Sequence, residues 1–178
     1  MHIVLVVAIS KDGFINHEGQ RHATEWTSKE DQTHFAALLT RYPLQLMGRT
    51  THEHNKDGMT FPAGRRRIVF THHADACTAK PGELTFTDEP ISTTLAHLEN
   101  EGFKEALLLG GGVLFTEFLD AGLVDEAFVT IEPQLFGSGI PFLTNGKELS
   151  DYTSLVLAED KPLNKTGTRL LHYIRSKA

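Results

Sequence analysis

The sequence predicts a mixed α/β domain whose central sheet is mostly parallel, is covered by helices on both faces and ends in an antiparallel C-terminal hairpin. Short apolar strands alternate with amphipathic helices along the first two-thirds of the 178 residues, as in sheets built from strand–helix–strand units. The last two expected strands, at 154–157 and 169–174, flank a turn-rich segment at 161–167, which is typical of a hairpin. Because no linker or internal repeat interrupts the chain, we expect a single domain over residues 1–178.

The N-terminal half is expected to hold four strands and two helical segments. Residues 3–9 form a continuous apolar, largely β-branched run, which is typical of a strand buried on both faces. Ser28 is a good N-cap with Asp31 at the capping-box spacing, and Pro43 ends the helix that follows. The apolar stripe of this helix consists of Phe35, Leu38, Leu39 and Tyr42. Further strands are expected at 44–47, 67–71 and 83–87, with a helical segment at 49–57 and a surface loop at 55–67.

The C-terminal half is expected to alternate in the same way. Ser92 is placed to cap a helix that carries Leu95 and Leu98. A strand at 106–109 stops at three glycines, and an apolar-striped helix then runs as far as Gly122. A strand at 127–131 precedes the hairpin.

The composition excludes several classes of protein. Apolar residues make up 40% of the chain and charged residues 22%, as in a globular domain. The net charge of −6 argues against a nucleic-acid partner held by bulk positive charge. Cys77 is the only cysteine, which excludes an intrachain disulfide, and no apolar run approaches the ~20 residues that span a membrane. We therefore expect a cytoplasmic protein with neither a membrane nor a nucleic-acid partner.

Two segments share one design, in which an apolar strand is followed by glycine and the start of a helix. In the first, Gly48 precedes Arg49, Thr50 and Thr51; in the second, the strand ends in the glycines at 110–112. A helix start presents unpaired N–H groups, and glycine lets a ligand approach the backbone, so each segment fits a phosphate. A ligand that spans both would be a dinucleotide. Gly48 alone fits a plain strand end equally well, and neither segment matches the G-x-G-x-x-G/A or P-loop pattern.

Asp31 is the candidate for acid–base chemistry. It lies four residues before Phe35, so a helix would place its carboxyl beside an aromatic ring. A carboxyl in a partly apolar pocket holds its proton nearer to neutrality, and it accepts two N–H bonds from an aminopyrimidine-like edge. Taken alone, the residue fits a helix cap better than an active-site acid.

Histidine is abundant, with ten in the chain, and the pairs His52/His54 and His72/His73 resemble pairs of metal ligands. They lack the H-E-x-x-H spacing that places two ligands on one helix face. Solvated loop histidines are therefore favoured over a metal site, and we expect none.

Five segments in order carry a resemblance to a known family. They are the strand and turn at 6–15, Trp26 five residues before Asp31, an M-G-R-x-T-x-E pattern at 47–53, the stretch at 62–71, and the glycine turn and helix at 110–119. Together they resemble the dihydrofolate reductase superfamily, which includes the reductase domain of the bifunctional riboflavin-biosynthesis deaminase-reductase. The resemblance covers nearly the whole chain and implies the three-layer fold of that superfamily.

The resemblance implies an NADPH-dependent reductase acting on a small heterocycle of pyrimidine or pterin type. It implies that Asp31, Trp26 and Thr130 serve catalysis and that the substrate contacts Val6, Asp31, Phe35 and Arg65. It implies cofactor contacts at Ala8, Ile15, Gly48, Arg49, Thr50, Thr51, Thr71, His72, Gly110, Gly111, Gly112, Val113, Leu114 and Phe115. Thr71 and His72 are expected near the adenosine 2′-phosphate, and the loop at 12–26 is expected to act as a lid.

The subfamily is left between two choices. Segments 122–126 and 132–143 look more like the riboflavin-type reductase and its free-standing relatives, which commonly form homodimers. The D-D-P-x-L-T segment of that reductase is missing after Thr51, where the chain is closer to dihydrofolate reductases. We favour the riboflavin type, with aminouracil ribosyl phosphate as its substrate. A dihydrofolate reductase proper, a non-catalytic NADP-binding relative and a histidine-based metallohydrolase remain as alternatives.

Overall fold

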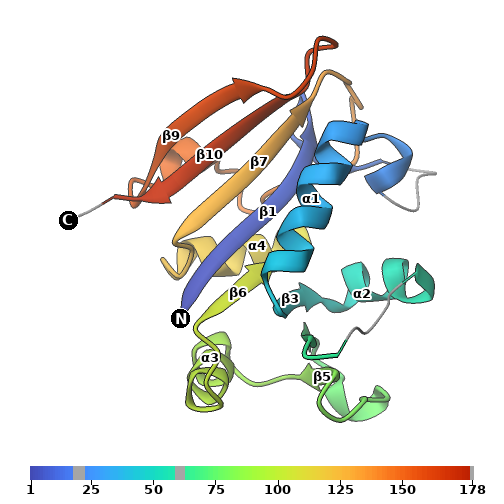
Figure 1. Ribbon diagram of the computed structural model, residues 1–178, viewed down its shortest axis with the longest axis vertical. Helices are drawn as coiled ribbons and strands as arrows, with labels where there is room; N and C mark the ends of the chain where they lie inside the picture. Colours follow the sequence, from blue (N-terminus) through green and yellow to red (C-terminus); the bar gives the residue numbers. More distant parts are fainter. Residues whose placement is uncertain (18–22, 59–62, 177–178) are drawn as a thin grey trace.

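The structure, a computed structural model, describes residues 1–17, 23–58 and 63–176. Parts of the loops expected at 12–26 and 55–67 therefore lie outside the described residues. An eight-stranded sheet runs through the molecule in the order β5-β4-β3-β6-β1-β7-β10-β9 (Figure 1). Its strands are β1 (His2–Ser10), β3 (Leu44–Gly48), β4 (Arg66–Phe70), β5 (Leu84–Thr87), β6 (Glu105–Leu108), β7 (Glu126–Glu132), β9 (Leu155–Pro162) and β10 (Arg169–Arg175).

Six strands of the sheet are parallel, and the C-terminal hairpin adds two antiparallel ones. β1 pairs with β6 on one side and with β7 on the other, both in parallel. β3 joins β6 to β4, and β4 joins β5, again in parallel. β10 pairs antiparallel with β7 and with β9, which forms the edge. The carboxyl ends of the parallel strands therefore meet at one edge of the sheet, where open α/β sheets bind ligands.

Helices cover both faces and make three layers. On one face α1 (Lys29–Arg41) packs its apolar stripe against Val4 and Val6 of β1, which Figure 1 shows as the helix crossing in front of that strand. On the other face α3 (Ile91–Asn100) and α4 (Gly112–Asp120) pack against Ile3 and Leu5. Successive residues of β1 thus serve opposite cores, which explains its uninterrupted apolar run. α2 (Arg49–Asn55) follows directly on β3.

The structure differs from the expected elements in four places. β2 (Phe14–Asn16) and β8 (Ile140–Pro141) form a small second sheet that no periodic pattern predicts, because both are very short. β9 extends to Pro162, into the segment expected as a turn. Ser92 lies inside α3 rather than before it; Pro90 is the N-cap and makes no side-chain capping bond. Ser28 does cap α1, but only half of the expected capping box forms, as described below.

Within the described ranges, no helix is both long enough and apolar enough to span a membrane.

Candidate active site

One cleft of about 1570 Å³ lies across the carboxyl ends of the parallel strands, between α1 and α2. Its floor takes residues from β1, β3 and β4, and its walls take residues from both helices and from the start of α4. Pockets for a single small ligand usually enclose about 300–1,000 Å³. The cleft therefore has room for two ligands side by side.

The middle of the cleft is formed by the two glycine turns, which the fold brings together. The backbone N–H of Gly48 donates to the Gly110 carbonyl oxygen at 2.7 Å. Gly110 has φ +91°, and a Cβ there would lie 2.5 Å from the Phe115 ring, so only glycine fits. A Cβ on Gly112 would lie 2.7 Å from the Pro141 carbonyl oxygen. At Gly111 a Cβ would meet nothing closer than 3.4 Å, an ordinary van der Waals contact, so this glycine leaves room for a methyl group in the cleft.

The start of α4 presents donors to this space. Gly111 is the N-cap and has no side chain to bond the first N–H groups of the helix. Val113 and Leu114, in the first turn, also line the cleft. Unpaired N–H groups at a helix start attract anions. Arg49 lines the same part of the cleft and adds a guanidinium that suits phosphate.

Asp31 forms the wall of the cleft at the start of α1 and is only 8% exposed. Burial raises the pKa of its carboxyl, the Thr130 hydroxyl opposes this by a hydrogen bond, and the nearby Glu132 charge adds to the rise. The carboxyl consequently holds its proton at higher pH than an exposed aspartate does. Phe35, one turn further along α1, lines the cleft beside it.

The ends of β4 and β5 close the cleft beyond α2. Thr71 follows β4, and its backbone N–H donates to the Thr87 carbonyl oxygen at 2.9 Å. Thr71 and His72 line the cleft here, and so do the carboxylates Asp88 and Glu89 of the β5–α3 connection. This end therefore mixes hydroxyl, imidazole and carboxylate groups.

The floor carries a polar pair that sequence reasoning missed. Arg67 of β4 donates from Nε to Gln45 Oε1 of β3 at 2.8 Å, and both side chains are buried and line the cleft. Burial lowers the pKa of Arg67, and the charge of Arg65, which also lines the cleft, adds to this effect. One signal was available in the sequence, since Gln45 is the only polar residue in the apolar run 44–47.

Most of the expected site residues line this cleft, but three do not. Trp26 is buried with its ring edge-on to Phe136 at 5.0 Å between centroids, and its neighbour Thr27 takes the position in the wall. Thr130 is buried behind Asp31 and reaches the site only through that carboxyl. Gly110 is buried and lies outside the cleft lining. The expected residues that do line the cleft are Val6, Ala8, Ile15, Asp31, Phe35, Gly48, Arg49, Thr50, Thr51, Arg65, Thr71, His72, Gly111, Gly112, Val113, Leu114 and Phe115.

The histidine pairs do not form a metal centre in the part of the chain that is described, where no three potential ligands converge. His52 is buried edge-on to Phe86, and this burial lowers its pKa. His54 and His73 line the cleft separately, from α2 and from the turn after β4.

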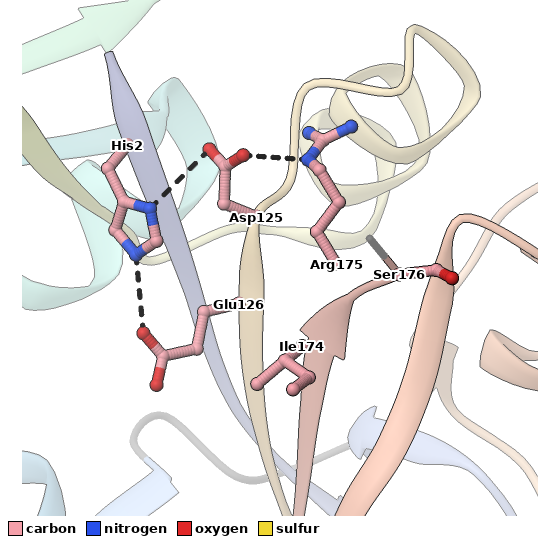
Figure 2. A pocket seen from close by; sticks show the side chains of 6 residues that line it. All are labelled: His2, Asp125, Glu126, Ile174, Arg175 and Ser176. Atoms are coloured by element: carbon pink, nitrogen blue, oxygen red, sulfur yellow. Dashed lines mark hydrogen bonds and ion pairs between the residues drawn. The ribbon is translucent and has the colours of Figure 1, made fainter. Parts of the chain in front are cut away.

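A second, shallow hollow lies at the opposite end of β1 and is filled with paired charges. Figure 2 shows His2 between Asp125 and Glu126, with nitrogen–oxygen distances of 3.9 and 3.3 Å. Arg175 donates to Asp125 at 2.7 Å, and His172 contacts the other Glu126 oxygen at 2.7 Å. Because Asp125 and Glu126 each already have nitrogen partners within this cluster, the hollow is a structural polar cluster rather than a second candidate site.

Comparison with known sequences matches residues 1–171 to the family described as the RibD C-terminal domain. Among curated proteins, the chain is 29% identical to the uncharacterized protein YwjB of Bacillus subtilis, over 97% of each chain.

Three solved structures share the fold. A putative riboflavin biosynthesis protein from Shewanella sp. PV-4 is 24% identical, with a TM-score of 0.77 over 99% of this chain and 100% of that one. Dihydrofolate reductase from Enterococcus faecalis, complexed with NADP(H) and RAB-propyl, is 20% identical, with a TM-score of 0.70 over 99% and 97%. A diaminohydroxyphosphoribosylaminopyrimidine deaminase/5-amino-6-(5-phosphoribosylamino)uracil reductase from Thermotoga maritima is 20% identical, with a TM-score of 0.76 over 98% of this chain and 56% of that one. These likenesses confirm the expected fold class.

Proposed function

The chain belongs to the RibD C-terminal domain family, and we propose that it is an NADPH-dependent reductase that delivers a hydride to a carbon of a pyrimidine- or pterin-type substrate. The family is of reductase type, and the Thermotoga maritima relative is named as an aminouracil reductase. We favour that riboflavin-type substrate, an aminouracil carrying a ribosyl phosphate.

One observation carries the proposal: a buried carboxyl and an uncapped helix start face the same continuous cleft. The cleft is larger than one small ligand needs, so a dinucleotide and a second, heterocyclic ligand fit together. A phosphate-binding helix start without an acid in the same cleft would suit a simple nucleotide-binding module. An acid in the same cleft supports chemistry on the second ligand.

The residues of the cleft fit an extended dinucleotide. The backbone at Gly111, the first turn of α4 and Arg49 would hold the two linked phosphates. Thr71 and His72 would hold the adenosine end, and Ala8 and Ile15 would border the nicotinamide. When bound, NADPH supplies the hydride.

The chain itself supplies orientation and a proton. Asp31 would hydrogen-bond the amino and ring nitrogens of the heterocycle, and Phe35 would pack against its flat face. Because its pKa is raised, Asp31 retains a proton that can reach the substrate directly or through water as the hydride arrives. The buried Arg67–Gln45 pair and Arg65 would face the substrate's tail and favour an anionic one.

A dihydrofolate reductase is the second candidate, because Arg65 lines the cleft and the resemblance implies for it the role of the arginine that contacts the folate carboxylate. Both candidates predict an anionic tail on the substrate. They differ in whether the tail ends in a phosphate or a carboxylate.

The test follows NADPH oxidation with aminouracil ribosyl phosphate and with dihydrofolate in parallel. We expect oxidation with the first, and a loss of about 10²–10⁴-fold in turnover for Asp31→Asn with little change in NADPH affinity. Glu30→Gln is the matched control, since Glu30 is the preceding carboxylate of α1 but its Oε2 accepts a hydrogen bond from Asn164 Nδ2 at 3.1 Å instead of lining the cleft.

Oxidation with dihydrofolate alone would identify the second candidate. Tight NADPH binding with no oxidation of either substrate would favour a non-catalytic NADP-binding relative. Equal turnover in the Asp31→Asn variant would remove Asp31 from the mechanism.

A further inference from the structure

We infer that Glu132 is a positioning residue for Asp31. Its carboxylate accepts the backbone N–H of Ser28, which Asp31 would otherwise cap, and it adds a second negative charge near the Asp31 carboxyl. Glu132 lies at the end of β7, outside the cleft lining. The inference rests on the proposed function, in which Asp31 holds the proton that reaches the substrate.

The start of α1 contains an interrupted capping box. In a complete box, the N-cap side chain accepts from the third helical residue, whose own carboxylate accepts the N-cap N–H. Ser28 Oγ does accept from the Asp31 N–H, at 3.3 Å. The Ser28 N–H, however, donates to Glu132 Oε1 at 2.7 Å. The Asp31 carboxyl therefore does not accept the Ser28 N–H, and it lies in the wall of the cleft.

The same chain contains a complete box for comparison. At the short helical turn Leu149–Asp151, the Glu148 side chain accepts from Asp151, and Asp151 Oδ2 accepts the Glu148 N–H at 2.8 Å. Asp151 stands in the position that Asp31 has in α1. The contrast indicates what an aspartate does at this position when no outside carboxylate takes the N-cap N–H.

Glu132 is held firmly in this role. It is 2% exposed, and its second oxygen accepts from the Thr168 hydroxyl at 2.7 Å, while Thr168 itself is 0% exposed. Both carboxylate oxygens thus have a donor, one from α1 and one from the turn before β10. A buried carboxylate needs such partners, and two short bonds fix its position.

The electrostatic effect on Asp31 follows from this placement. The groups that act on its carboxyl are the Thr130 and Thr27 hydroxyls and one charge, that of Glu132. Neighbouring Glu30 on α1 bonds Asn164 instead. Two carboxylates in one buried region disfavour a second negative charge, so Glu132 helps Asp31 to stay protonated. Buried proton donors of enzymes are tuned by such neighbours.

The test compares Glu132→Gln with Thr168→Val. The glutamine keeps the shape and an oxygen for the Ser28 N–H but removes the charge. The valine removes the bond on the far oxygen and leaves the charge in place. The primary readout is the protonation of Asp31 in the resting protein, followed by infrared difference spectroscopy against Asp31→Asn, and the second is the pH profile of NADPH oxidation.

We expect the midpoint of Asp31 protonation, and the pH dependence of turnover with it, to move to lower pH in Glu132→Gln and to stay near the wild-type position in Thr168→Val. Glu132→Met is a second charge-free variant with the same expected direction of shift; because it also removes the acceptor of the Ser28 N–H and the Thr168 hydroxyl, its folding is checked by thermal melting. An unchanged midpoint in the charge-free variants, or an equal shift in Thr168→Val, would overturn the inference. Because the infrared titration needs no substrate, it decides the matter even if neither substrate is reduced.

Discussion

Adding a single methyl group at Gly111 should separate ligand binding from folding. A Cβ there would lie 3.4 Å from Thr51 Oγ1 and 3.9 Å from Ile15 Cδ1, in ordinary van der Waals contact with two residues of the cleft. The backbone at Gly111 has φ −86°, outside the left-handed region that favours glycine. Alanine is a poorer N-cap than glycine, which lowers the free energy of unfolding by up to about 1 kcal/mol. It also reduces the conformational entropy of the unfolded chain, which raises the free energy of unfolding by about 0.4–1 kcal/mol. The stability of Gly111→Ala should therefore stay close to that of the wild type.

The affinity for NADPH should fall. The methyl group occupies the space through which a phosphate reaches the first N–H groups of α4. Each charge-assisted hydrogen bond lost costs about 1.5–3 kcal/mol, and about 1.4 kcal/mol corresponds to a tenfold change in affinity. We expect the dissociation constant to rise by roughly 10- to 100-fold, measured by calorimetric or fluorescence titration of NADPH.

Gly112→Ala is the matched control, one residue further along the chain. Its Cβ would lie 2.7 Å from the Pro141 carbonyl oxygen and 3.1 Å from that of Phe142, so the backbone itself must move. Overpacking of this kind costs about 1–3 kcal/mol, which thermal or denaturant unfolding would reveal. If Gly111→Ala bound NADPH as tightly as the wild type, the phosphate seat at α4 would be refuted.

Four further outcomes are expected. Phe118→Ala should lower the free energy of unfolding by about 3–5 kcal/mol in denaturant melts, because its ring is fully buried. The Ser10 hydroxyl and the Gly137 N–H lower the pKa of Asp12 from 3.8 to about 2. The hydrogen bonds from Asp12 to the 136–137 loop should therefore be fully formed above pH 3.8 and lost as the pH falls towards 2, which amide exchange at Gly137 would measure. Asp12→Asn should lack this pH dependence. Asp31→Asn should be more stable than the wild type at alkaline pH in thermal melts. Excess chelator should leave turnover unchanged, and a loss of activity would revive a metal site.

Much of the fold could be predicted because buried parallel strands and amphipathic helices repeat a simple pattern. Residues of the run 3–9 are buried in the cores on both faces of the sheet, and the apolar stripe of α1 packs against one of these faces. The local periodicity of the sequence therefore predicts the layers directly. β2 and β8 could not be found this way. They have three and two residues, and their pairing is set by the approach of two distant loops.

The glycine turns of the candidate site were visible in the sequence, whereas its buried polar partners were not. Glycines between a buried strand and a helix point to a backbone constraint, and the structure gives the reason in the contact of Gly110 with Phe115. Glu132 and Arg67 act through partners more than 20 residues away along the chain, at 2.7 and 2.8 Å. No local pattern encodes such a contact, so only the fold reveals them.

Asp31 illustrates why the site is costly for the fold. Its pKa is raised above its ordinary value of 3.8, chiefly by burial, so the folded state holds the proton more tightly than the unfolded chain does. Folding stability must then fall as the pH rises from 3.8 through the raised pKa, and the deficit is fully present above it. Asparagine removes this charge while keeping the size of the side chain. The increase in folding stability in Asp31→Asn should therefore be absent in acid, grow as the pH rises from 3.8 through the raised pKa, and then level off. A gain that is the same at every pH would indicate better packing instead of a buried carboxylate. Greater stability with lost turnover is the result expected if the carboxyl is retained for chemistry despite its cost to folding.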